Sequence, residues 1–257
     1  MSKKPRILTL DIETAPLKVY NWSLWQDSTS VNMIDTEWQI LAVCAKWLGG
    51  KPSYMDIRFA HTDRDLLQWV WGLLNTADIV ITQNGKSFDI KKINARLIAE
   101  GFPPYSPIRQ IDTKEVAHKH FGFTSNKLEW MGKNIAKVAK SQHKKFPGFE
   151  LWAECLKGNV AAWNEMQKYN IQDVVATEKL YLKMRPWVEG HPNLGTYDTA
   201  SGLIPCPKCG SSDVQRRGTS VTQTGRYPRF CCMSCGGWAR GRKTELPPAR
   251  NRLLLSN

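Results

Sequence analysis

The stretch Ile7-Leu8-Thr9-Leu10-Asp11-Ile12-Glu13-Thr14 begins with an apolar run and ends with two acidic residues in alternate positions. Residues 7–11 predict a short buried strand. Because side chains alternate between the faces of a strand, Asp11 and Glu13 share one face near its end, and Ile12 points into the core. Neighbouring carboxylates repel each other unless a cation lies between them, and a divalent metal ion is the usual one. A solvated strand end is the alternative explanation for such a pair.

Other segments with strand or helix periodicity follow this first strand. Strands are predicted over residues 39–47, 53–59, 79–82 and 108–112, the first two as a hairpin around the turn at 49–52. Helices are predicted over residues 63–74, 89–100, 128–139 and 160–187, the last with one break. Strands interspersed with helices predict an α/β fold with a mixed sheet covered by helices.

Two more polar clusters fall at informative places. Asn84-Gly85 follows the buried strand 79–82 and permits a sharp turn. We expect Phe88 to anchor the next helix in the core and Asp89 to face the sheet end from its first turn; alternatively, Asp89 only caps that helix. Tyr169 and Asp173 are four residues apart and share a helix face. Here the alternative is a core tyrosine beside a surface acid.

Together these clusters resemble the three motifs of the DnaQ-like, or DEDD, 3′–5′ exonucleases of the ribonuclease-H-like superfamily, across residues 5–190. The motifs occur in the family's order as Asp11-Ile12-Glu13-Thr14, Asn84 to Asp89, and Tyr169 to Asp173. Lys168 stands where the histidine subclass has its histidine, so the chain looks like the tyrosine subclass, DEDDy.

The resemblance implies a ribonuclease-H-like fold and a hydrolytic mechanism that releases nucleoside monophosphates. Asp11, Glu13, Asp89 and Asp173 would hold two Mg²⁺ or Mn²⁺ ions, and Tyr169 would orient the attacking water. It also implies substrate contacts for Thr14, Asn84 and Phe88. With the four acids complete, we interpret Asp112 as structural or as a support for the site.

The cysteines form a second constellation near the C-terminus. Cys206 and Cys209, like Cys232 and Cys235, enclose two residues, and a glycine follows each pair. Two such turns bring four thiolates to one tetrahedral Zn²⁺, so residues 204–242 predict a zinc ribbon with strands at 214–218 and 227–231 and a structural zinc. Cys231 is interpreted as spare. An odd number of cysteines and the absence of a signal-peptide pattern favour a reducing, cytoplasmic compartment.

The charge distribution favours a polyanionic partner. The 257 residues carry 36 basic and 23 acidic side chains, a net charge of +13. Residues 204–257 hold ten of the basic residues and two of the acidic ones. The candidate phosphate contacts in this segment are Arg216, Arg217, Arg226, Arg229, Arg240 and Arg242. Tyr227, Phe230 or Trp238 is available for stacking, and a ribbon that docks a protein is the alternative. The longest apolar run, residues 40–45, is too short to span a bilayer, so no membrane partner is expected.

These observations predict an exonuclease domain over residues 1–190, a linker over 191–203, the zinc ribbon over 204–242 and a flexible or partner-docking basic tail over 243–257. The expected enzyme is a metal-dependent 3′–5′ exonuclease acting on DNA, whether single-stranded or at 3′ ends. The preference for DNA over RNA rests on the resemblance and the ribbon. An exoribonuclease of the same fold, an endonuclease and a catalytically silent nucleic-acid-binding subunit are the alternatives, and the sequence does not specify a polymerase or repair partner.

Overall fold

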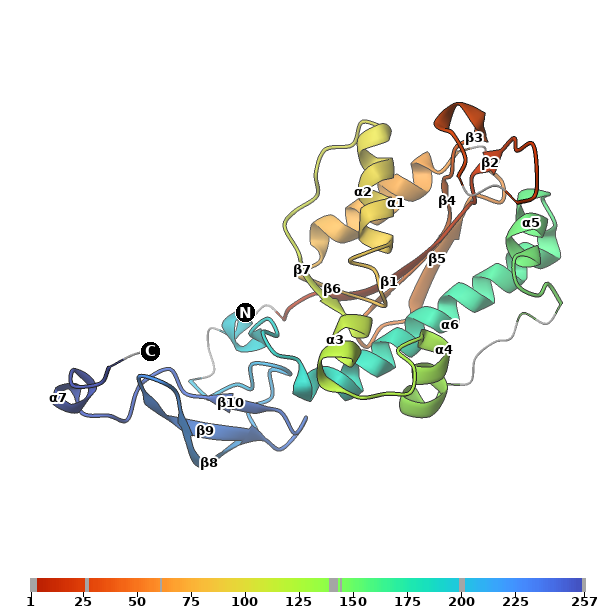
Figure 1. Cartoon of the computed structure of the whole chain (residues 1–257). Coiled ribbons are helices and arrows are strands. Elements are labelled where there is room, and N and C mark those ends of the chain that lie inside the picture. Colours follow the sequence, from red (N-terminus) through yellow and green to blue (C-terminus); the bar gives the residue numbers. More distant parts are fainter. Residues whose placement is uncertain are drawn as a thin grey trace. The chain divides into compact units, whose positions relative to one another are not determined.

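The structure, a computed structural model, describes residues 4–25, 28–60, 62–138, 143, 145–198 and 202–255. The chain forms two compact units, Arg6–Tyr181 and Leu182–Asn257 with the chain start Met1–Pro5 (Figure 1). The domain boundaries predicted at residues 190, 203 and 242 stay a prediction.

A mixed five-stranded sheet forms the centre of the first unit. Its strand order is β5-β4-β1-β6-β7. The strands are β1 (Ile7–Thr14), β4 (Ile40–Trp47), β5 (Pro52–Asp56), β6 (Ile79–Thr82) and β7 (Arg109–Asp112). β1 runs antiparallel to β4 and parallel to β6, and β7 extends the parallel part. The predicted mixed sheet and the β4–β5 hairpin are therefore confirmed.

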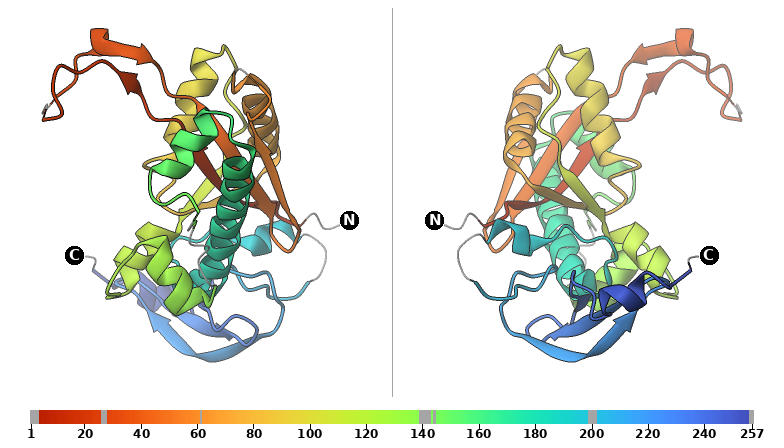
Figure 2. Two further views of the ribbon diagram at one scale, coloured as in Figure 1. Left: turned by 90° about the vertical axis from the view of Figure 1, so that its right-hand side faces the viewer. Right: turned by 90° about the vertical axis from the view of Figure 1, so that its left-hand side faces the viewer.

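Helices cover both faces of this sheet (Figures 1 and 2). α1 (Arg64–Thr76) and α2 (Asp89–Ala99) lie on one face, and α6 (Val160–Met184) lies on the other. The alternation in β1 agrees with this arrangement, because Leu8, Leu10 and Ile12 are buried in the main apolar cluster together with residues of α1 and α2. α6 ends before Pro186, and the short helix η3 (Arg185–Trp187) follows, so the predicted break is confirmed.

A fully buried carboxylate ties the first face together. Asp63 precedes α1 and accepts hydrogen bonds from the backbone N–H of Ile40 in β4, at 2.9 Å, and from Nε and Nη2 of Arg96 in α2, at 2.9 and 2.7 Å. Removing one partner of such a buried pair typically costs about 3–5 kcal/mol. The position of α2, which carries Asp89, is therefore fixed against the sheet.

Three parts of the first unit differ from the prediction. The helix expected over 128–139 consists of α4 (Leu128–Met131) followed by a π-helical turn, η2 (Gly132–Ala136), and its expected end at residue 139 lies outside the described residues. α3 (Thr113–His120) and α5 (Glu150–Leu156) were not predicted. α3 buries only Thr113 and Ala117, so its sequence carries almost no apolar periodicity.

An unpredicted arm also leaves the sheet directly after β1. It contains β2 (Lys18–Val19), β3 (Ile34–Thr36) and the short helix η1 (Val31–Met33), and Figure 2 shows that it extends away from the sheet. Trp22, Leu24 and Trp25 on this arm are more than 90% exposed. Such apolar exposure is unusual in one short segment.

The second unit contains a three-stranded antiparallel sheet, which we call the C-terminal sheet. Its strands are β8 (Val214–Val221), β9 (Arg226–Cys232) and β10 (Trp238–Arg240), with β9 in the middle. β8 and β9 include the two predicted ribbon strands, whereas β10 was missed. A short helix, η4 (Leu194–Tyr197), precedes the sheet, and α7 (Pro248–Asn251) forms within the tail that was expected to be flexible or partner-docking.

Among the helices of the described residues, none combines the length and the apolar character needed to cross a bilayer.

Candidate active site and candidate zinc site

The end of β1 forms a polar site because its parallel neighbour stops early. β6 pairs with β1 only from Ile7 to Thr9, so the later backbone of β1 has no strand partner on that side. The chain leaves β6, turns and begins α2 with Asp89, whose Oδ1 accepts a hydrogen bond of 3.0 Å from the backbone N–H of Ile12. A carboxylate from the helix start thus takes the place of a strand and lies beside Asp11 and Glu13.

Asp112 holds the turn that places Asp89. Asp112 is buried at the end of β7, and its carboxylate accepts hydrogen bonds from the backbone N–H groups of Asn84, at 2.8 Å, and Lys86, at 3.2 Å. It also caps α3 through the backbone N–H groups of Lys114 and Glu115. The structure therefore gives Asp112 the structural role that we expected.

The turn itself leaves no room for side chains on its inner side. Asn84 has a φ of 68°, a conformation that asparagine tolerates better than most residues. A Cβ atom added to Gly85 would lie 2.4 Å from the Cβ of the buried Thr82. The predicted sharp turn is confirmed, and glycine is required at its second position.

α6 supplies the opposite side of the site. Asn170 is fully buried, and its Nδ2 donates a hydrogen bond of 2.6 Å to Oδ2 of Asp11. Asn170 was not predicted, although a polar residue four positions from the buried Met166 and Val174 was a usable signal. Asp173 and Tyr169 come from the same helix, and the Tyr169 hydroxyl donates a hydrogen bond to Asp173. These contacts bring Asp11, Tyr169 and Asp173 to one place.

The four predicted acids interact electrostatically. Burial, followed by the charges of Asp89, Glu13 and Asp173, raises the pKa of Asp11 well above its ordinary value. Burial and the charges of Asp173 and Asp89 raise the pKa of Glu13 to about 8. Burial also raises the pKa of Asp89 to about 7, against the lowering effect of the Ile12 N–H. Carboxylates that share a site repel each other in this way when no cation neutralises them.

An aromatic group borders the acids. Trp152 of α5 forms a hydrogen bond to Glu13, and its ring lies 6.1 Å from the Tyr169 ring in an edge-on arrangement. His143 packs edge-on against both rings, at 6.0 and 5.3 Å. Burial raises the pKa of Tyr169 above its ordinary value, as do the charges of Asp173, Glu13 and Asp11, so this hydroxyl keeps its proton. Trp152 was not predicted, because no local spacing connects it to the acids.

The three other residues predicted to contact substrate have different surroundings. Thr14 follows a register shift at the end of β1, directly after Glu13. Asn84 borders a polar cavity of about 260 Å³. Phe88 does not anchor α2 in the core as expected: the residue is 39% exposed and precedes the first helical position. Its ring centre lies 5.9 Å from the Nζ of Lys92.

The donor set of the acidic cluster fits hard cations. All four predicted ligands offer carboxylate oxygens, which Mg²⁺ and Mn²⁺ prefer. The raised pKa values of Asp11, Glu13 and Asp89 mean that a cation would relieve the burial and the repulsion of charge built into the fold. A nearby cation would in turn lower these pKa values and favour the charged ligands.

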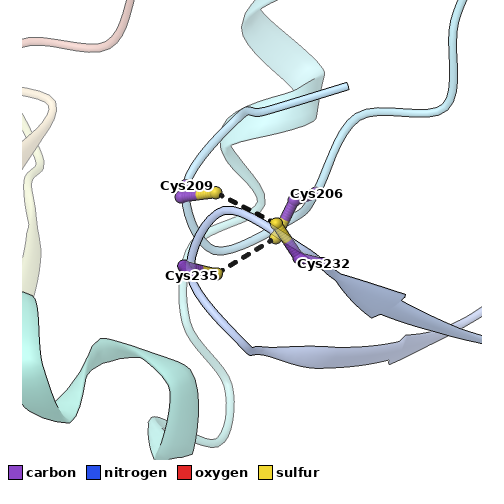
Figure 3. A group of neighbouring side chains, drawn as sticks. All are labelled: Cys206, Cys209, Cys232 and Cys235. Carbon is purple, nitrogen blue, oxygen red and sulfur yellow. Dashed lines mark hydrogen bonds between the residues drawn. The ribbon is translucent and has the colours of Figure 1, made fainter. Parts of the chain in front are cut away.

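The cysteine cluster is a separate and tighter group. Within the part of the chain that the structure describes, it is the one set of three or more His, Cys, Asp or Glu side chains whose ligand atoms all lie within 4.8 Å of one another (Figure 3). Sγ distances are 3.8 Å between Cys206 and Cys235 and 3.6 Å between Cys209 and Cys232. A tetrahedral zinc with Zn–S bonds of about 2.3 Å implies S–S distances of about 3.8 Å. The four thiols could therefore hold a zinc ion.

The two cysteine turns have the same backbone design. The backbone N–H of Gly210 donates to the carbonyl of Cys206, and that of Gly236 to the carbonyl of Cys232, both at 2.9 Å. Both glycines, which follow the second cysteine of each pair, have a φ near 77°, a conformation that glycine adopts without strain. Burial raises the pKa of the Cys232 thiol, but the backbone N–H groups of Cys235 and Ser234 lower it to about 7. This thiol ionises readily, as a zinc ligand must.

The first prediction concerns the pH dependence of stability without added Mg²⁺ or Mn²⁺. Glu13 keeps its proton in the folded state up to about pH 8, whereas the unfolded chain loses it near the ordinary value of 4.5. The folded state then binds more protons between these values, so the free energy of unfolding falls as the pH rises. In Glu13→Gln this fall should be shallower, by up to about 1.4 kcal/mol per pH unit. Urea denaturation from pH 5 to 8 measures both slopes, and parallel curves would contradict the assignment.

The second prediction concerns the cysteines. The purified chain should contain one zinc ion, measured by elemental analysis and by its release with a mercurial reagent. Cys235→Ser should lose most of this zinc because one of four ligands is gone. Cys231→Ser is the matched control and should retain the wild-type zinc content. Equal losses in both variants would mean that Cys231 takes part.

Comparisons with known proteins agree with this architecture. Residues 38–185, more than half of the chain, match the RNase_H_2 family of the RNase_H superfamily. Among solved structures, the chain is similar to the family B DNA polymerase from the hyperthermophilic archaeon Pyrobaculum calidifontis, with a TM-score of 0.56 and 14% sequence identity. The match covers 72% of this chain and 25% of the polymerase chain. No curated protein matches the sequence.

The likeness to the polymerase, at this identity, shows the fold alone. The family match covers most of the sheet, the helix α2 that begins with Asp89, and the helix α6 that carries Tyr169 and Asp173. Together with the mixed five-stranded sheet, these findings show that the chain belongs to the RNase H superfamily.

Proposed function

We propose that this chain is a two-metal-ion 3′–5′ exonuclease that releases nucleoside monophosphates from DNA. The observation that carries the proposal is the convergence of Asp11, Glu13, Asp89 and Asp173, whose mutual repulsion calls for cations. Membership of the RNase H superfamily supports nuclease activity on a nucleic-acid substrate. The 3′–5′ direction and the choice of DNA rest on the resemblance of the three motifs to DnaQ-like enzymes.

In this mechanism the four acids would hold two Mg²⁺ or Mn²⁺ ions, which activate a water molecule and stabilise the leaving 3′ oxygen. The chain's own contacts set the ligand positions. The backbone N–H of Ile12 holds Asp89, and Asn170 holds Asp11. Because both donors belong to rigid elements, the ligands need little rearrangement when the site is loaded.

Tyr169 is suited to position the attacking water rather than to take its proton. Its pKa is raised by burial and by the neighbouring acids, so the phenol remains a hydrogen-bond donor and acceptor at neutral pH. Contacts with Trp152 and His143 restrict its ring. The hydroxyl therefore stays beside Asp173.

The central test is the loss of a proposed metal ligand. Asp173→Asn should slow hydrolysis of 3′- and 5′-labelled oligonucleotides by at least about 1000-fold in Mg²⁺ or Mn²⁺, because it removes a ligand charge from the site. Glu154→Gln is the control, since Glu154 pairs with Lys157 and Asn159 away from the acids. Near-normal turnover in Asp173→Asn would end the two-metal assignment.

Other substrates in the same assay separate the proposal from its alternatives. Faster digestion of single-stranded RNA than of DNA would make the chain an exoribonuclease. Cleavage of a circular single strand would indicate an endonuclease. No hydrolysis with either metal ion would leave a silent nucleic-acid-binding subunit.

Tyr169→Phe tests the positioning role. The variant should reduce kcat by about 10- to 1000-fold, the usual effect of losing one positioning hydrogen bond, while the Mg²⁺ concentration for half-maximal activity stays the same. The ring and its aromatic contacts remain, so stability should change little. An unchanged kcat would restrict Tyr169 to packing.

A further inference from the structure

The register of the C-terminal sheet places several predicted nucleic-acid contacts on one face. In antiparallel pairs, directly opposed residues point to the same face. Arg229 lies opposite Arg240, and Cys231 lies opposite Trp238. Tyr227 precedes Arg229 by two positions on β9 and shares its face. We call Tyr227, Arg229, Trp238 and Arg240 the arginine–aromatic face.

The members of this face form two cation–aromatic pairs across the strands. The Cζ of Arg229 lies 4.9 Å from the centre of the Trp238 ring, and that of Arg240 lies 4.2 Å from the Tyr227 ring. Trp238 remains 48% exposed despite this contact. Each pair therefore places a guanidinium charge over one side of an aromatic ring.

The charge on this face is not neutralised within the fold. Arg229 and Arg240 form no ion pair with any carboxylate that the structure describes. Arg216 differs, because it lies opposite Phe230 and therefore on the other face, where it pairs with Glu245. Of the arginines singled out in the sequence, Arg216 is thus the least available to a phosphate.

A hollow continues the face beyond Trp238. The hollow has a volume of about 510 Å³, and its walls include Trp238, Trp187 and the cations Lys183 and Arg185, next to the second cysteine turn. Trp187 is 54% exposed. Two indoles at one opening, with cations beside them, offer stacking surfaces and phosphate contacts together.

We propose that the arginine–aromatic face and this hollow bind single-stranded nucleic acid, with bases stacked on Trp238 and Tyr227 and phosphates held by Arg229 and Arg240. The inference rests on the proposed nuclease function, which supplies the nucleic acid. Duplex bases are stacked on one another and do not offer their faces to aromatic side chains. The face should therefore prefer single strands, whereas charge alone would attract both forms.

Binding measurements on the full-length, zinc-loaded chain test the proposal. All proteins carry Asp173→Asn so that the substrate survives, and fluorescence anisotropy gives Kd for a labelled deoxythymidine oligonucleotide and for a blunt duplex. Trp238→Ala should weaken single-strand binding by about 5- to 150-fold, the range for losing one stacked base, and change duplex binding less than 3-fold. Trp238→Phe should restore most of the affinity. Zinc content verifies that each variant is folded.

A matched pair of arginine variants separates the face from general charge. Arg229→Ala and Arg216→Ala remove the same charge from opposite faces. Arg229→Ala should weaken binding and lower the slope of log Kd against log salt by about 0.7, whereas Arg216→Ala should leave both nearly unchanged. Equal effects of the two variants, unchanged binding in Trp238→Ala, or equal losses for single strand and duplex would overturn the proposal. Unchanged binding throughout would instead favour a protein partner.

A small substrate keeps this test independent of the proposed activity. The chain without Asp173→Asn should hydrolyse the p-nitrophenyl ester of thymidine 5′-phosphate, which carries a single base and cannot lie along the arginine–aromatic face. Trp238→Ala should leave that rate unchanged. If the chain hydrolyses this ester but Trp238→Ala does not change oligonucleotide binding, only the arginine–aromatic face is refuted. If the expected binding pattern appears but the ester is not hydrolysed, only the exonuclease is refuted.

Discussion

The hydrogen bond from the Ile12 N–H to Asp89 is the contact on which the proposed active site depends. It forms because β6 stops opposite Thr9 and leaves the rest of β1 without a parallel partner. An unpaired buried N–H is costly, so the carboxylate at the start of α2 contributes to stability as well as to the site. The same bond places Asp89 beside Asp11 and Glu13, and Asp112 fixes the turn that precedes it. The asymmetry of a mixed sheet, antiparallel on one side of β1 and parallel on the other, thus creates the position that a metal ligand would occupy.

The two units of the chain concentrate side chains of opposite charge. In the first unit, burial and the neighbouring acids raise the pKa values of Asp11 and Glu13, which makes the site unfavourable for negative charge and receptive to cations. In the second unit, arginines are concentrated and two of them rest on aromatic rings instead of carboxylates. Both arrangements leave charge uncompensated within the protein, and a metal-loaded nuclease acting on a polyanion would compensate both. This pairing is a physical reason for a nuclease fold and a basic cysteine-rich sheet to occur in one chain.

The sequence was most informative where one local pattern determines one feature. Fully buried strands such as residues 79–82 appear as short apolar runs, and the cysteine turns appear as a spacing followed by glycine. The four acids were singled out because their motifs occur on recognisable elements. The sequence did not reveal Trp152 or Asn170, since each reaches the acids through the tertiary fold. The exposed position of Phe88 was also missed, because an aromatic residue before a helix reads as a core anchor. The face to which Arg216 belongs depends on strand register, which composition does not encode.

A residue can be essential because it builds the site or because it performs the chemistry, and Gly85 is essential in the first sense. Any side chain there would overlap with Thr82, so the position admits one amino acid for reasons of space. Gly85 contributes no ligand, yet a larger residue would displace the start of α2 and with it the carboxylate of Asp89. In a mutational scan scored by activity alone, Gly85 would rank with the acids, and in a scan scored by abundance it would rank with the core. Comparing the two scores would separate the residues that build the site from those that perform its chemistry.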